Sequence, residues 1–150
     1  MNIKEFELPA TIHQKLSSKS LLGKWSILYF YPKDNTPGCT TQACDFTSHY
    51  QDFQSLGCEI VGINDNPIKM HEKFQEKYSI PYPLVTDEDR SFLEAMGVWK
   101  LKKFMGKEYM GIVRTTLIVN PKGEIVKRYD EVKTKGHTEQ VLADLRALMS

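Results

Sequence analysis

The sequence has almost no net charge and few cysteines. Its 150 residues include 20 Lys and Arg against 19 Asp and Glu, a formal net charge of +1. The chain therefore lacks the strong net basicity that gives proteins affinity for nucleic-acid phosphates. Three cysteines, an odd number, are too few for a paired disulfide framework. The low net charge argues against a nucleic-acid partner, and the low number of cysteines argues against a secreted domain held together by disulfides.

Long hydrophobic runs are also missing. The longest aliphatic and aromatic run is Ile27 to Tyr31, whereas a helix needs about 20 apolar residues to cross a bilayer. The N-terminus has no charged region followed by the apolar stretch of about 7–15 residues that an export signal carries. We therefore expect a cytoplasmic protein with no membrane segment. In that compartment thiols stay reduced, so a close cysteine pair indicates redox catalysis or metal ligation.

What the chain does have is the make-up of one globular domain. Apolar residues account for 41% of it, and 150 residues is an ordinary size for one domain with a real core. No repeat, low-complexity segment or linker divides the sequence. We therefore expect residues 1–150 to form a single domain.

Strand and helix patterns alternate along the chain. Apolar runs predict strands at 26–31, 58–63, 82–85 and 115–119, and a Pro-Lys-Gly turn predicts a hairpin partner for the last at 125–129. Four helices are marked by apolar spacing: Ala43, Phe46, Tyr50 and Phe53, ended by Gly57; His71, Phe74 and Tyr78, ended before Pro81; Phe92, Leu93 and Met96; and Val141, Leu145 and Leu148. This order predicts an α/β, thioredoxin-like fold, with a mixed central β-sheet flanked by helices on both faces.

Two of the three cysteines follow the first predicted strand. Thr36 before Pro37 is typical of a helix N-cap with proline at the first helical position, so Cys39 is predicted in the first helical turn. Unpaired backbone N–H groups and the helix dipole favour a thiolate there, and the thiolate is the nucleophilic form. The alternative is that Cys39 is a small buried residue near a helix start.

Cys44 lies five positions after Cys39. Helical residues at this spacing have Cα atoms about 8.6 Å apart, whereas a disulfide needs less than about 7 Å. A Cys39–Cys44 bond would therefore require the first turns of the helix to unwind. Because it would close so few residues, it would be a poor structural staple and would act as a conformational switch. The alternative for Cys44 is a core-facing helix residue.

The residues around Cys39 resemble the peroxiredoxin family. The segment Pro32-x-x-x-Thr36-Pro37-Gly38-Cys39-Thr40 is similar to its peroxidatic motif. Cys44 resembles the resolving cysteine of the bacterioferritin comigratory protein, or peroxiredoxin Q, subfamily. The similarity continues through Gly-Val-Trp at 97–99, Met-Gly-Lys at 105–107 and Gly-Ile-Val-Arg-Thr-Thr at 111–116, so it covers most of the chain. The chain departs from the pattern near its start, where an Asp-Gly hairpin is absent, and at Asn64, where serine is common.

This resemblance implies a thiol peroxidase that reduces hydrogen peroxide and organic hydroperoxides in antioxidant defence and redox homeostasis. Cys39 would attack the hydroperoxide and become a sulfenic acid. Cys44 would then form an intramolecular disulfide with Cys39, which releases water. Thioredoxin, or a glutaredoxin-like reductant, would reduce that disulfide. No metal, haem or flavin cofactor is implied.

The resemblance also implies which groups assist Cys39. The Thr36 hydroxyl, the backbone N–H groups of Gly38 and Cys39, and the Arg114 guanidinium would stabilise the negative charge on the departing oxygen. Pro32 would shield the site from water. Without the resemblance, Arg114 is more typical of a strand-edge salt bridge or a surface arginine, and Pro32 of a strand terminator.

The remaining cysteine and the histidines do not indicate a second site. Cys58 falls in a predicted core strand, where it is expected as a buried hydrophobe. Histidines occur at positions 13, 49, 71 and 137, and none is spaced from the cysteines as a zinc ligand would be, so no metal is predicted. The aromatic residues at 29–31 are predicted in the core, with a place beside the active site as the alternative.

Two other functions fit part of this pattern. A thioredoxin-type disulfide reductase normally carries C-x-x-C, whereas Thr36 occupies the earlier cysteine position here, which favours a cysteine that reacts with peroxide. A non-catalytic redox sensor would share the first half-reaction, and the sequence leaves this alternative open. Resolution within one chain needs no partner subunit, so a monomer is expected.

Overall fold

A five-stranded mixed sheet forms the centre of the computed structural model, which describes all 150 residues. The strands lie in the order β5 (Leu84–Thr86), β4 (Cys58–Asn64), β3 (Trp25–Phe30), β8 (Thr115–Val119) and β9 (Ile125–Tyr129). Strands β3, β4 and β5 are parallel, whereas β8 is antiparallel to both β3 and β9. The predicted mixed sheet and the β8–β9 hairpin are confirmed.

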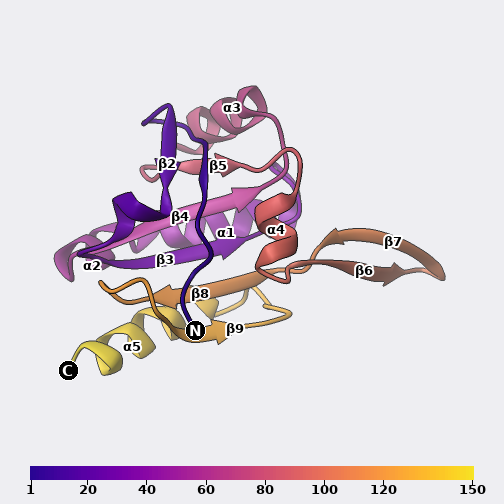
Figure 1. The fold of residues 1–150 in the computed structure, drawn as a ribbon. Coiled ribbons are helices and arrows are strands. Elements are labelled where there is room, and N and C mark those ends of the chain that lie inside the picture. The colour runs from indigo at the N-terminus through magenta and orange to yellow at the C-terminus, as the bar shows by residue number, and fades with distance from the viewer.

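Helices cover both faces of this sheet (Figure 1). One face packs against α1 (Pro37–Ser48), α2 (Tyr50–Ser55), α3 (Ile68–Tyr78) and α5 (His137–Met149); the other packs against α4 (Ser91–Ala95) and the N-terminal segment. Side chains of β3 alternate between the two cores, with Ile27 and Tyr29 in the first and Leu28 and Phe30 in the second. None of these helices has the length and apolar character needed to cross a bilayer.

The aromatic residues at 29–31 and Cys58 lie in the core, as the sequence predicts. The side chains of Tyr29, Phe30 and Tyr31 are fully buried. Cys58 is 3% exposed, and burial, followed by the nearby Glu59 carboxylate, raises the pKa of its thiol to about 12. Cys58 is therefore a buried, unreactive thiol, as expected.

The helix expected to run from Ala43 past Phe53 is in fact two helices, which corrects the sequence analysis. His49 lies between α1 and α2 with φ −103° and ψ 8°, outside the helical region. Phe46 of α1 and Phe53 of α2 nevertheless pack in one core. The apolar spacing continued across the break because both helices turn an aromatic side chain toward the sheet.

Four short strands and a 3-10 helix were not predicted. Strand β1 (Glu7–Pro9) pairs with β2 (Lys15–Ser17), which leads into a 3-10 helix at Ser18–Leu21. Strand β6 (Trp99–Phe104) pairs with β7 (Lys107–Ile112), and this hairpin extends away from the sheet in Figure 1. Its turn residues Met105 and Gly106 both have positive φ, as a two-residue hairpin turn requires. Most side chains of the hairpin are exposed, so no buried pattern marks it in the sequence.

His137, the first residue of α5, gives the fold a pH dependence. The residue is 8% exposed, and its Nε2 lies 2.8 Å from the Thr116 hydroxyl. Burial, followed by the positive charge of Arg114, lowers the pKa of His137 from 6.5 to about 4. As pH falls, the unfolded chain therefore takes up a proton before the folded chain does. The free energy of unfolding should decrease as pH falls from about 6.5 to about 4.

Replacing His137→Gln should flatten this part of the pH–stability curve, because glutamine keeps a side-chain donor but does not titrate. Urea unfolding across this pH range measures the slope. The exposed His13→Gln variant is the matched control and should keep the wild-type slope. Equal losses of stability in wild type and His137→Gln would show that this histidine does not contribute.

Candidate active site

Cys39 lies in the first turn of α1, as the Thr-Pro pair predicts. Its side chain is 1% exposed and belongs to the core between α1 and the sheet. Pro37 has no N–H, and the N–H groups of Gly38 and Cys39 make no backbone hydrogen bond. The sulfur is therefore at a helix start whose unpaired donors can stabilise an anion.

Arg114 brings a permanent positive charge to this sulfur. It directly precedes β8, and the pairing of β8 with β3 places it beside the start of α1. Its Nη2 donates to Cys39 Sγ at 3.4 Å, and its Nη1 donates to Gln42 Oε1 at 2.7 Å. The structure thus brings together Cys39 and Arg114, which are 75 positions apart in the sequence, and the guanidinium stabilises negative charge on the sulfur.

Gly38 makes room for the guanidinium. A Cβ atom at this position would lie 3.2 Å from Arg114 Nη2. This distance is tighter than ordinary van der Waals contact, so a larger residue would shift the guanidinium or the helix start by a few tenths of an ångström. Gly38 therefore leaves space for the guanidinium, a role that the sequence alone did not predict.

Gln42 is a site residue that the sequence analysis missed. It lies one turn after Cys39, so both side chains project from the same face of α1. Gln42 is 1% exposed; its Oε1 holds Arg114, while its Nε2 is buried without a hydrogen-bond partner. A polar residue three positions after Cys39, on a helix face that also carries Ala43 and Phe46, was the available signal.

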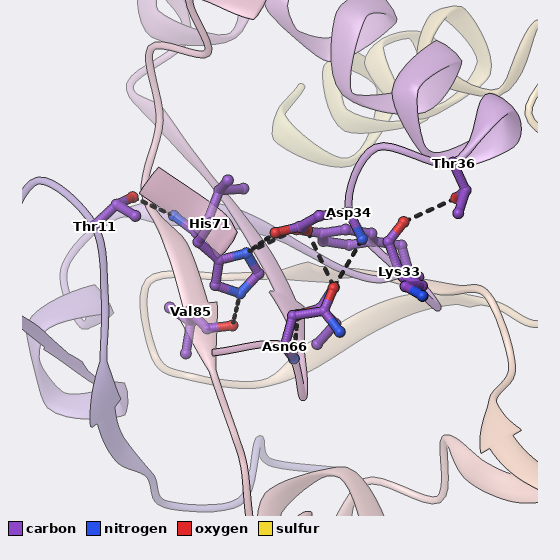
Figure 2. A network of polar contacts seen from close by, with 10 residues as sticks. Thr11, Lys33, Asp34, Thr36, Asn66, His71 and Val85 are labelled. Carbon is purple, nitrogen blue, oxygen red and sulfur yellow. Dashed lines mark hydrogen bonds and ion pairs between the residues drawn. The ribbon is translucent and has the colours of Figure 1, made fainter. Parts of the chain in front are cut away.

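Thr36 occupies the N-cap position, but its side chain does not cap the helix. Its Oγ1 donates to the carbonyl of Lys33 at 2.8 Å, as Figure 2 shows, and makes no bond to a helix N–H. The capping prediction is therefore wrong in this respect, because the hydroxyl finds an acceptor within its own loop. The Thr36 carbonyl accepts from the N–H of Thr40 at 2.8 Å.

Pro32 lies at the edge of an open hollow next to Arg114. The hollow measures about 590 Å³, and Pro32, Arg114 and Lys102 are among its lining residues. Lys102 donates to the carbonyl of Ile112 at 2.9 Å, and burial, followed by the charge of Arg114, lowers its pKa. Lys102 is a second cation that the sequence analysis missed, because it lies on the unpredicted β6–β7 hairpin.

Cys44 shares α1 with Cys39, and all three cysteines are free thiols. The helix is unbroken between the two residues, so their Cα atoms are about 8.6 Å apart and cannot be bridged in this conformation. Burial, followed by the neighbouring Asp45 carboxylate, raises the pKa of Cys44. In the wound helix Cys44 is therefore held as a thiol.

The arrangement suits attack by a cysteine sulfur on a small substrate that leaves as an anion. No group of three or more His, Cys, Asp or Glu side chains is placed to hold a metal ion. A buried cysteine at a helix start, beside an arginine that directly precedes a strand of a thioredoxin-like sheet, is the arrangement expected of a thiol peroxidase.

Comparison with known proteins identifies the family within this class. Residues 2–128 match the AhpC/TSA family. Peroxiredoxin Bcp of Bacillus subtilis is 41% identical over 142 residues, which cover 95% of this chain and 90% of the relative. A protein of Coxiella burnetii named putative peroxiredoxin bcp is 40% identical over 140 residues, 93% of each chain.

Solved structures agree with this assignment. A cysteine-to-serine variant of Xanthomonas campestris peroxiredoxin Q superposes with a TM-score of 0.92 at 35% identity, covering 97% of this chain and 92% of that one. A second structure, from work on the alkyl peroxide reduction activity of the X. campestris bacterioferritin comigratory protein, gives a TM-score of 0.91 at 35% identity and covers 97% and 91%. The chain belongs to the AhpC/TSA family, in its peroxiredoxin Bcp or peroxiredoxin Q group. It is therefore a thiol peroxidase with the thioredoxin-like fold that the sequence predicted.

Gly38→Ala should displace the guanidinium from Cys39 and slow the reaction of Cys39 with peroxide about tenfold or more. Arg114→Ala should slow it by about 10²–10³, the cost of one lost charge-stabilising donor. Stopped-flow measurement of the second-order rate constant tests both variants. Ser48→Ala, at an exposed position of the same helix, is the control. A wild-type rate constant in Arg114→Ala would mean that the contact between Arg114 and Cys39 does not set the rate.

Asp45→Asn should lower the pKa of Cys44, because it removes a carboxylate that disfavours the thiolate. The rate of disulfide formation should then reach its half-maximum at lower pH. The shift should be less than about one unit, since burial, the larger cause, remains. Single-turnover disulfide formation measured against pH gives the shift, with Asp52→Asn in α2 as the control. An unchanged profile would contradict the assigned effect of Asp45.

Proposed function

We propose that Cys39 is the peroxidatic nucleophile and that Cys44 resolves its oxidised form. The observation that carries the proposal is the 3.4 Å hydrogen bond from Arg114 Nη2 to Cys39 Sγ in the first turn of α1. The other two thiols have less suitable surroundings, because burial raises the pKa of both Cys44 and Cys58. Only the thiolate of cysteine is a strong nucleophile.

In the first step, the Cys39 thiolate attacks the terminal oxygen of the hydroperoxide in line with the O–O bond. The S–O bond forms as the O–O bond breaks, and the electron pair leaves with the other oxygen. That oxygen takes up a proton and departs as water or an alcohol, while Cys39 becomes a sulfenic acid. Arg114 and the N–H groups of Gly38 and Cys39 stabilise the developing negative charge. The Thr36 hydroxyl would join them only after turning away from the Lys33 carbonyl, to which it donates in this structure. Pro32 keeps water from the sulfur.

In the second step, the Cys44 thiolate attacks the Cys39 sulfur and expels the sulfenic oxygen as water. Residues between 39 and 44 must leave the helical conformation for this bond to form. Unwinding also takes Cys44 out of the partly buried position that raises its pKa. The same movement therefore brings the two sulfurs together and makes Cys44 more nucleophilic.

We infer that the substrates are hydrogen peroxide and organic hydroperoxides, and that one thioredoxin-like domain carries the whole reaction. Alkyl peroxide reduction by the related X. campestris protein supports this substrate class, as does the open hollow next to Arg114. Thioredoxin, or a glutaredoxin-like dithiol, would reduce the Cys39–Cys44 disulfide by thiol exchange and complete an antioxidant cycle. A cytoplasmic location and a monomeric state remain predictions.

A thioredoxin-coupled assay of NADPH consumption with hydrogen peroxide tests this proposal. Cys39→Ser should abolish turnover, because it removes the nucleophile. Cys44→Ser should reduce about one equivalent of peroxide per chain and then stop, because the sulfenic acid is not resolved. Cys58→Ser is the matched control and should cycle like wild type. Full thioredoxin-dependent cycling by Cys39→Ser would sink the assignment.

A further inference from the structure

A cluster of buried polar side chains holds in place the loop that leads to Cys39. Asp34, in the loop between β3 and α1, is 2% exposed and lies at its centre. One carboxylate oxygen, Oδ2, is 2.6 Å from His71 Nδ1 on α3. The other, Oδ1, accepts hydrogen bonds from the Tyr31 hydroxyl at 2.6 Å and from Asn64 Nδ2 at 3.2 Å. Figure 2 shows Asp34 between His71 and Asn66. The reaction steps above use none of these side chains.

The contact between His71 and Asp34 is a short hydrogen bond sealed from water. His71 Nε2 lies 3.1 Å from the carbonyl oxygen of Val85, which can only accept, so Nε2 carries a hydrogen. On the other side of the ring, Nδ1 faces the Asp34 carboxylate, and one proton lies between them. Both side chains are 0% exposed. Removing either partner would leave an unpaired polar or charged group in the interior, which is strongly unfavourable.

The main chain of Asp34 is held as firmly as its side chain. Its N–H donates to Asn66 Oδ1 at 2.8 Å. Asn66 is itself fixed by Asn64, whose Nδ2 donates to the same oxygen at 3.1 Å and whose Oδ1 accepts from the Asn66 N–H at 2.9 Å. Beyond Asp34, the next side-chain contacts are exposed: Asn35 Oδ1 accepts from Lys77 and Tyr78, and the Thr36 hydroxyl bonds within the loop. Asp34 is thus the last firmly held residue before α1.

This position matters because α1 must exist in two states. Attack on peroxide needs the wound helix, with the Cys39 sulfur at the helix start beside Arg114. Resolution needs the unwound segment, because a disulfide cannot span residues 39 to 44 of a helix. A fixed residue five positions before Cys39 holds the entry of the chain into the helix.

We propose that the His71–Asp34 pair is a positioning device that sets the Cys39 loop for peroxide attack and restrains the unwinding of α1. This inference rests on the proposed function of Cys39 and Cys44. His71 and Asp34 are positioning residues, since neither contacts the sulfur. Weakening the pair should make the first step slower and the second step more probable.

The effect on the second step, disulfide formation, is measurable because the Cys39 sulfenic acid can react in two ways. In the wound state a second hydroperoxide can oxidise the sulfenic acid to a sulfinic acid, and that hydroperoxide is reduced to water or an alcohol. In the unwound state Cys44 displaces the sulfenic oxygen as water and forms the disulfide. The ratio of disulfide to sulfinic acid therefore reports the balance between the two states of α1, and a variant that loses a similar contact elsewhere in the fold serves as the comparison.

Three variants weaken the cluster to different degrees. Tyr31→Phe removes only the hydroxyl that donates to Asp34 and keeps the buried ring. His71→Asn can keep a donor near the place of Nδ1, toward Asp34. His71→Gln instead reaches the place of Nε2, toward the Val85 carbonyl, and loses the contact with Asp34. Comparing the two His71 variants separates the contact with Asp34 from the mere presence of a polar side chain.

Stopped-flow kinetics and intact-protein mass spectrometry at high hydrogen peroxide give the two readouts. We expect His71→Gln to slow sulfenic acid formation about tenfold and to raise the ratio of disulfide to sulfinic acid several-fold, the scale of a lost buried hydrogen bond. Tyr31→Phe should change both in the same direction by a smaller factor. His71→Asn should stay closer to wild type than His71→Gln does.

Tyr129→Phe is the matched control, because it also removes a tyrosine–aspartate hydrogen bond, to Asp144, but between β9 and α5. It should keep the wild-type rate constant and product ratio. Values are compared per folded molecule, with the folded fraction measured by circular dichroism.

An unchanged rate constant and an unchanged product ratio in His71→Gln and Tyr31→Phe, with only reduced stability, would overturn the proposal. If His71→Gln does not fold, Tyr31→Phe alone decides by the same criterion. Failure of the proposed function itself would be separate, because wild type would then form no Cys39–Cys44 disulfide.

Discussion

The contact between the Arg114 guanidinium and the Cys39 sulfur is the interaction on which the rest of the site depends. It needs three features of the fold at once. The antiparallel pairing of β8 with β3 brings Arg114 to the end of β3, the start of α1 presents the sulfur at that end, and Gly38 leaves space for the guanidinium. Gln42 then holds the guanidinium from the same helix. The sheet order β5-β4-β3-β8-β9 is thus a condition for the chemistry as well as for the core.

The three thiols of the chain differ because their surroundings differ. Cys39 has a cation within hydrogen-bonding distance and lies at a helix start. Cys58 lies among apolar side chains at the beginning of β4, where burial suppresses ionisation. Cys44 is between these extremes, since it is half-buried and next to a carboxylate. In the proposed mechanism, one residue type therefore serves as nucleophile (Cys39), as bystander (Cys58) and as a nucleophile only after unwinding (Cys44), depending on the charge and solvent around each sulfur.

The parts of the structure that local patterns determine were predictable from the sequence. The apolar runs gave β3, β4 and β8, and the Thr-Pro pair gave the start of α1, because each depends on neighbouring residues. Arg114 was assigned through the family resemblance. The break at His49 was missed because aromatic spacing continues across it, and the β6–β7 hairpin because its side chains are exposed. The pairing of Asp34 with His71 was beyond reach, since it exists only once α3 has docked against the loop.

The break at His49 divides the helical segment after β3 into two cooperative units. The first, α1, has twelve residues, a length at which an isolated helix is only marginally stable in water. Its helical state is therefore maintained by tertiary contacts, among them the buried side chains of Ala43 and Phe46 and the Tyr82 hydroxyl on the Ala43 carbonyl. Since α2 is a separate helix anchored by Phe53, unwinding at the start of α1 does not have to extend into α2. The free energy of switching is thus set mainly by packing on one short helix, and substitutions at that surface would tune the enzyme without touching a reacting atom.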